Sequence, residues 1–177
     1  NQMMQAARAA GERVFDILDQ EIERPNCNGK LALPVKGQIQ YENVGFRYGE
    51  ERETLVEINL KAQPGEMIAL VGPTGAGKSS LVNLLPAFYE LNSGRITIDG
   101  QDTANASLES LRSIMSVVSQ ESFLFNGSIR ENILYGKLEA SEEEMLAATR
   151  AANCHHFITA LPDGYDSHVG ERGVKLS

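Results

Sequence analysis

The sequence lacks long hydrophobic runs and has fewer basic than acidic residues. No apolar stretch approaches the roughly 18 residues that cross a bilayer. No signal-peptide pattern is present either, so we expect the chain itself to be soluble. With 16 Lys and Arg against 24 Asp and Glu, the formal net charge is −8. This deficit of positive charge argues against a broad nucleic-acid-binding surface, although a local phosphate site remains compatible with it.

Cysteine and histidine are also scarce. The two cysteines, Cys27 and Cys154, are far apart, and neither belongs to a C-x-x-C pair. Two free thiols in a reducing compartment are therefore favoured over a disulfide or a thiolate metal site. His155 and His156 have no other ligand type nearby, so we interpret them as structural or surface residues. At 177 residues the chain is long enough for one domain with a substantial core.

A glycine-rich motif of the form G-x-x-x-x-G-K-[ST] stands near the middle of the chain. Its residues are Gly72, Pro73, Thr74, Gly75, Ala76, Gly77, Lys78 and Ser79. Residues 67–71 predict a short buried strand before the motif, and residues 79–85 predict the first turns of a helix after it. The order of strand, glycine-rich loop and helix is the context in which this motif predicts a phosphate site.

The residue types of the motif explain that prediction. Its glycines permit backbone angles that a side chain would forbid, so successive N–H groups can face one anion. The following helix adds about half a positive charge at its N-terminus. Lys78 offers a full charge to the terminal phosphates, and the Ser79 hydroxyl is a suitable ligand for Mg²⁺, which prefers oxygen donors. The alternative, an accidental glycine-rich turn, does not account for the flanking strand and helix.

The part of the chain before residue 100 is rich in β signals. An amphipathic helix is predicted over residues 1–22, followed by a loop or linker that contains Pro25 and Pro34. Strands are predicted over residues 39–46, 54–62 and 95–98, and the last is closed by the hairpin signal Asp99-Gly100. We expect these strands to be antiparallel.

The part after residue 100 is mostly helical. A short helix is predicted over residues 107–112, and the apolar residues 114–118 predict a strand that ends near Gln120. Two S-x-x-E capping boxes then predict helix starts at Ser128 and Ser141. The helices expected last cover residues 142–153 and 155–160.

These motifs, in this order, resemble the nucleotide-binding domain of an ABC transporter of the exporter type. The resemblance covers residues 39–177, and the preceding helix is similar to the segment that descends from the last membrane helix. It is carried by V-G-F-R-Y at 44–48, Walker A with Ser80 after it, S-G-R-I-T-I-D-G at 93–100, V-V-S-Q at 117–120, the residues around 123–133, V-G-E-R-G at 169–173 and L-S at 176–177.

The resemblance implies an α/β fold of the P-loop NTPase class, with an antiparallel β subdomain and the beginning of a helical subdomain. It divides the chain into a lead-in helix and linker, residues 1–36, and the N-terminal part of the nucleotide-binding domain, residues 37–177. It also implies that Tyr48 stacks on adenine, whereas an isolated tyrosine after a strand is more often a core or edge aromatic.

The implied cofactors are ATP and Mg²⁺, bound by the motif residues, Ser80 and Gln120. Ser79 and Gln120 would be magnesium ligands, and Lys78 and Gln120 would act in catalysis. The implied partners are a second nucleotide-binding domain, in a homodimer or a heterodimer, and the transmembrane domain of the same polypeptide. Gln120 and residues 169–173 would contact that membrane domain, at the cytoplasmic face of the cell membrane.

The sequence departs from the family pattern at Ser177, where the LSGGQ signature has only begun. The rest of the signature, the Walker B strand, the catalytic Glu and the switch His follow in the family, so this chain alone is expected not to hydrolyse ATP. Three alternatives remain open. They are a degenerate, poorly hydrolysing half of a heterodimeric exporter, a soluble ABC protein of translation or DNA repair, and an unrelated P-loop kinase.

Overall fold

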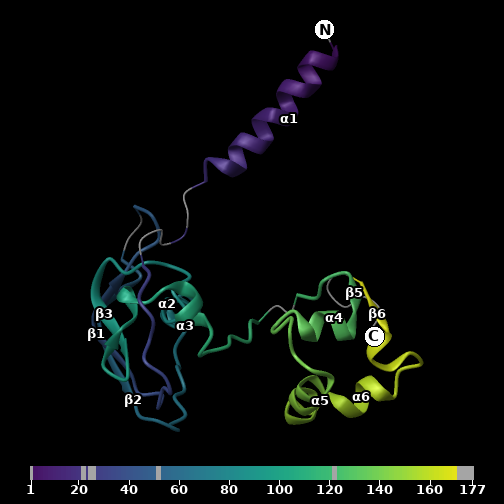
Figure 1. The fold of residues 1–177 in the computed structure, drawn as a ribbon. Helices are drawn as coiled ribbons and strands as arrows, with labels where there is room; N and C mark the ends of the chain where they lie inside the picture. Colours follow the sequence, from purple (N-terminus) through teal and green to yellow (C-terminus); the bar gives the residue numbers. More distant parts are fainter. Residues whose placement is uncertain (1, 21–22, 24–26, 51–52, 121–122, 171–177) are drawn as a thin grey trace. The chain divides into compact units, whose positions relative to one another are not determined.

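The computed structural model describes residues 2–20, 23, 27–50, 53–120 and 123–170. It divides into two compact units, Asn1–Ser116 and Val117–Ser177. In Figure 1 the labelled strands β1 to β3 and helices α1 to α3 belong to the first unit, and helices α4 to α6 and the β5–β6 pair belong to the second. The mixed α/β composition agrees with the predicted fold class.

The first unit is built on a four-stranded sheet with the order β2-β1-β3-β4. The strands are β1 (Ile39–Phe46), β2 (Leu55–Ala62), β3 (Ser93–Ile98) and β4 (Gln101–Asp102). Every neighbouring pair is antiparallel, which confirms the prediction. The predicted hairpin is confirmed as well, since Asp99 and Gly100 both have positive φ, as a two-residue turn between twisted strands requires.

Two short helices pack on this sheet. Helix α2 (Lys78–Leu84) follows the glycine-rich loop and buries Leu81 and Leu84 against Val44 and Ile96 of the central strands. Helix α3 (Leu108–Arg112) buries Leu111 in a second cluster with Ile98. Complete burial of one such side chain contributes about 1.5–3 kcal/mol, so α2 is fixed on the sheet mainly by these contacts.

Two of the predicted strands are wrong for this structure. Residues 67–71 and 114–118 form no strand. Met67 and Val71 are 95% and 93% exposed, and Val118 is 97% exposed. A strand is stable only where a neighbouring strand pairs with its backbone, and no strand in the described part of the chain pairs with either segment. The apolar pattern was therefore insufficient to form them.

The second unit is mainly helical. Its helices are α4 (Ile129–Leu134), α5 (Glu142–Ala151) and α6 (His155–Thr159), and both predicted capping boxes are present at Ser128 and Ser141. A short ribbon that the sequence pattern did not predict pairs β5 (Gly127–Ser128) with β6 (His168–Val169). The core of this unit consists of Ile129, Met145, Ile158, Tyr165 and Val169.

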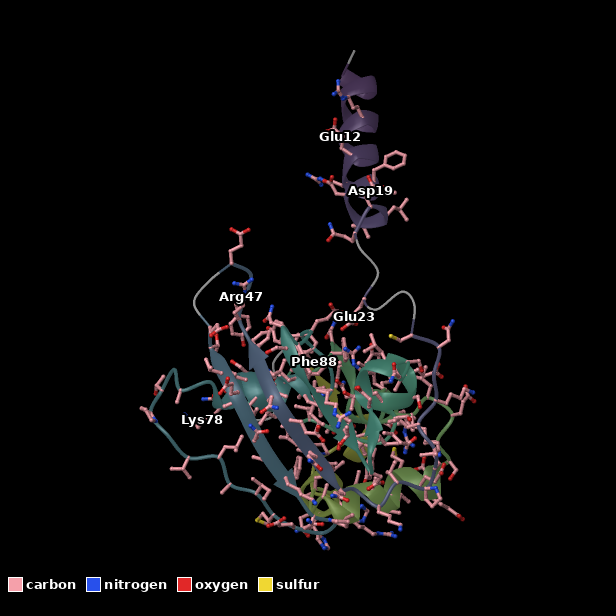
Figure 2. All side chains as sticks on the ribbon, turned by 90° about the vertical axis from the view of Figure 1, so that its left-hand side faces the viewer. Glu12, Asp19, Glu23, Arg47, Lys78 and Phe88 are labelled. Atoms are coloured by element: carbon pink, nitrogen blue, oxygen red, sulfur yellow. The ribbon has the colours of Figure 1, made fainter. Side chains whose placement is uncertain are left out.

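Helix α1 (Gln2–Leu18) confirms that the segment expected to be helical over residues 1–22 contains a helix, and its role as a lead-in from an upstream domain stays a prediction. Residues 1, 21 and 22 lie outside the described residues. Glu12 and Asp19 point away from the helix axis into solvent (Figure 2), and the side chains of Phe15 and Leu18 are also exposed. None of the helices that the structure describes combines the length and apolar character needed to span a bilayer.

Candidate functional site

The glycine-rich loop leads directly into helix α2, which begins at Lys78. Gly75 and Gly77 have φ of 84° and 82°, a backbone conformation that glycine adopts without strain. Gly77 is also buried, and a Cβ there would lie 2.7 Å from Leu55 Cδ2 and 3.2 Å from Thr54 O. A Cβ on Gly75 would meet nothing within 4 Å. Close packing against the start of β2 therefore fixes the end of the loop at Gly77.

Lys78 folds back over the loop that precedes it. Its Nζ donates to the backbone oxygens of Gly72 and Pro73, at 2.8 Å and 2.7 Å. Figure 2 shows Lys78 at the rim of the first unit. Both acceptors are neutral carbonyls, and a hydrogen bond from an ammonium to an ionised oxygen is roughly twice as strong as one between neutral groups. An anion placed in the loop would therefore compete well for this ammonium group.

Several donors of the loop remain available. Inside the loop, the Ala76 N–H donates to Pro73 O at 3.2 Å. Among the residues that the structure describes, the N–H groups of Gly75, Gly77 and Ser79 meet no protein acceptor. The Ser79 side chain is exposed. Backbone N–H groups, one ammonium and one hydroxyl form a donor set that fits a polyphosphate accompanied by Mg²⁺.

Tyr48 lies two residues beyond the end of β1 and belongs to an aromatic cluster with Phe46 and Tyr89. Its ring centroid is 4.7 Å from that of Phe46 and 5.1 Å from that of Tyr89, with interplanar angles of 80° and 88°. Its hydroxyl lies 2.9 Å from Ser80 Oγ. The structure thus brings Tyr48 and Ser80 together beside the loop. Stacking of Tyr48 on adenine stays a prediction.

Other predicted site residues lie in the second unit. Gln120 is an exposed residue of that unit, and its role as a magnesium ligand and coupling residue stays a prediction. Val169 is fully buried in the core of the unit, and Gly170 is half-buried. Residues 171–173 of the predicted coupling loop and the L-S pair at 176–177 lie outside the described residues.

Asp99 closes the β3–β4 hairpin and also holds the linker. Its carboxylate accepts the backbone N–H groups of Lys36, Gly37 and Gln38, at 2.5, 3.3 and 2.9 Å. The hydrogen bond from Gln38, followed by those from Lys36 and Gly37, lowers the pKa of Asp99 despite some desolvation. The sequence indicated a turn here, whereas the structure adds a carboxylate that ties residues 36–38 to the sheet.

Several polar residues of the second unit interact with one another. The Tyr165 hydroxyl lies 2.7 Å from Thr149 Oγ1 and 2.9 Å from His155 Nδ1, which places His155 in a structural network. Arg130 pairs with Glu142 and Asp166, and hydrogen bonds to these carboxylates raise its pKa. Both cysteines are free thiols. Within the described ranges no group of three His, Cys, Asp or Glu residues is placed to hold a metal ion.

The loop, its lysine and the following helix define a P-loop nucleotide-binding protein as the class to which this chain belongs. Comparison with known proteins then gives the family. The family model described as "ABC transporter" matches residues 55–177. The chain belongs to the ABC transporter family.

Relatives with similar sequences carry the names of ATP-binding or ATP-binding cassette proteins. The chain is 46% identical over 175 residues to an uncharacterized ABC transporter ATP-binding protein of Bacillus subtilis, covering 98% of this chain and 29% of the relative. It is 47% identical over 167 residues to human ATP-binding cassette sub-family B member 6, covering 94% of this chain and 20% of the relative.

A solved structure also resembles the chain. It is a bacterial Atm1-family ABC exporter with ATP bound, which superimposes with a TM-score of 0.86 at 41% identity. The match covers 98% of this chain and 30% of that one. The fold class and the resemblance to exporter nucleotide-binding domains are therefore confirmed. The chain spans less than a third of the length of each of these proteins.

Sequence reasoning missed Tyr89 as a neighbour of Tyr48. The pair Phe88-Tyr89 comes after α2, with residues 85–87 in between, so two adjacent aromatic residues soon after a P-loop helix were a visible signal. That signal did not say which partner the rings contact. The contact of Tyr89 with Tyr48 depends on how α2 packs on the sheet.

Proposed function

We propose that this chain provides the MgATP-binding part of an ABC exporter. The supporting observation is the loop at residues 72–79, whose N–H donors at Gly75, Gly77 and Ser79 meet no acceptor among the described residues and whose ammonium donates to two carbonyl oxygens. In this assignment the ammonium of Lys78 holds the terminal phosphates. The N–H groups of Gly75 and Gly77 hold the adjacent phosphate oxygens, and Ser79 ligates Mg²⁺. The bound metal neutralises phosphate charge during phosphoryl transfer.

In the full-length protein we infer that two such domains act together. Each would bind ATP, and hydrolysis would drive export of a substrate across the membrane. Gln120 and residues 169–173 would connect the ATP site to the transmembrane domain, as an equilibrium coupling between two sites. In this proposal the chain would act at the cytoplasmic face of a cell membrane. The similarity to an ATP-bound exporter structure over 98% of the chain supports this reading over a kinase.

The assignment is tested by Lys78→Ala in the full-length protein, with Lys61→Ala as a matched control. Lys61 is an exposed residue of β2 and carries the same charge. Removing the Lys78 ammonium takes away at least one charged hydrogen bond, which is worth about 1.5–3 kcal/mol. We expect MgATP affinity to fall about 10- to 150-fold, ATP-driven transport to be abolished and Lys61→Ala to behave as the unaltered protein. Undiminished ATPase activity in Lys78→Ala would refute the assignment.

A further inference from the structure

One hydrogen bond joins Tyr48 to the helix that carries the phosphate loop. The Tyr48 hydroxyl lies 2.9 Å from Ser80 Oγ, and Ser80 is only 6% exposed. Ser80 follows Ser79 directly and stands in the first turn of α2. A buried hydroxyl that loses its partner pays a desolvation penalty, so this pair resists separation. The position of the Tyr48 ring is thus linked to the position of the residues that bear the phosphate donors.

The Tyr48 ring is also held from two other directions. Phe46 and Tyr89 both meet it nearly perpendicularly, at centroid distances of 4.7 Å and 5.1 Å. Edge-to-face arrangements of this kind are favoured by the charge distribution of aromatic rings. Phe46 is buried in β1, and Tyr89 follows α2 at 42% exposure. The ring is therefore fixed between the sheet and the segment after α2 before any nucleotide is present.

We propose that Ser80 and Tyr89 are positioning residues that hold Tyr48 as a preformed platform for the nucleotide base. This inference rests on the proposed function, because it concerns the same ATP site. Preorganisation raises affinity because less conformational freedom is lost on binding. The gain in affinity from a preformed Tyr48 ring is expected only for ligands that carry a base. It is absent for inorganic tripolyphosphate, which offers the same phosphate chain to the loop without a base or ribose.

The test compares the affinities of the full-length protein for MgATP and for magnesium tripolyphosphate. Tyr48→Phe removes the hydroxyl and keeps the ring, whereas Ser80→Ala removes the other partner. A hydrogen bond of this kind changes an equilibrium about three- to tenfold, so we expect each variant to lower the ratio of ATP to tripolyphosphate affinity by that factor. The double variant is expected to lose no more than either single variant, because both remove one interaction.

Tyr89 provides the matched control for this experiment. Tyr89→Phe removes a phenol hydroxyl from the same cluster and keeps the ring contact, so we expect the affinity ratio to be unchanged. Tyr89→Ala removes the ring, and the ratio is expected to fall. An unchanged ratio in Tyr48→Phe, or additive losses in the double variant, would overturn the positioning role of Ser80. An unchanged affinity ratio in Tyr89→Ala would overturn the positioning role of Tyr89.

The same measurements separate this inference from the proposed function. Lys78→Ala is expected to weaken both ligands, because the ammonium contacts phosphates in either case. If Lys78→Ala left both affinities unaltered, the phosphate site itself would be wrong. If Lys78→Ala weakened the binding of both ligands while the Tyr48 and Ser80 variants bound ATP normally, the phosphate site would be supported and the preformed platform would be refuted.

Discussion

Substituting Gly77 tests how the loop is held against the sheet. Gly77→Ala adds one Cβ at a residue with φ of 82°, and that atom would come 2.7 Å from Leu55 Cδ2. Gly75→Ala is a matched control, because Gly75 has φ of 84° but open space around the added atom. Both variants impose the same backbone strain, and only the first imposes a collision with β2.

The backbone strain and the collision with Leu55 cost different amounts of free energy. Placing an L-residue in the left-handed region costs about 1–2 kcal/mol. Overpacking a buried site adds about 1–3 kcal/mol, since Leu55 is itself only 5% exposed and has little room to move. We therefore expect Gly75→Ala to destabilise the loop and α2 by about 1–2 kcal/mol and Gly77→Ala by about 2–5 kcal/mol.

Hydrogen exchange at the Leu81 amide is a suitable measurement. This N–H donates to Gly77 O at 2.9 Å, so its protection reports the opening of the first turn of α2. Each 1.4 kcal/mol changes the opening equilibrium tenfold. The substitution Leu55→Val removes the colliding Cδ2 and is expected to recover part of the protection in the Gly77→Ala background.

The reasoning would be refuted by equal loss of protection in the two glycine variants. That result would mean that backbone strain alone matters and that the contact with Leu55 does not restrain the loop. Failure of Leu55→Val to recover any protection would contradict the same contact independently.

Two further predictions concern Asp99 and Gln120. Asp99→Asn removes a carboxylate whose pKa is lowered by hydrogen bonds from Gln38 and its neighbours. These hydrogen bonds stabilise the folded protein fully above the unfolded pKa near 3.8, and this stabilisation is lost as the pH falls through the lower folded pKa. The thermal midpoint of Asp99→Asn is therefore expected below that of the unaltered protein at neutral pH, and the difference between the two midpoints is expected to shrink in acid. A difference that stays constant as the pH falls would contradict this reasoning. Gln120→Ala is expected to reduce ATP-driven transport while changing ATP affinity far less than Lys78→Ala does, and equal losses of affinity would argue against a coupling role.

The sequence alone was sufficient for many of the local elements and for the family. The strands around Val44 and Ile96, the capping boxes at Ser128 and Ser141 and the glycine-rich loop were predicted because each depends on residues close in sequence. Alternation, capping and turn chemistry act over a few residues, so they are visible without a tertiary structure. The order of the motifs then indicated the ABC family, which the comparisons confirm.

Tertiary structure decided what depends on distant partners. The segment at residues 67–71 was predicted as a strand from its apolar pattern, but backbone pairing requires a neighbouring strand, and the described residues provide none. The carboxylate of Asp99 on the linker and the hydroxyl of Tyr48 on Ser80 join residues more than 30 positions apart, at separations of 61 and 32. The motif thus determined which groups can bind a phosphate, and packing determined what holds those groups in place.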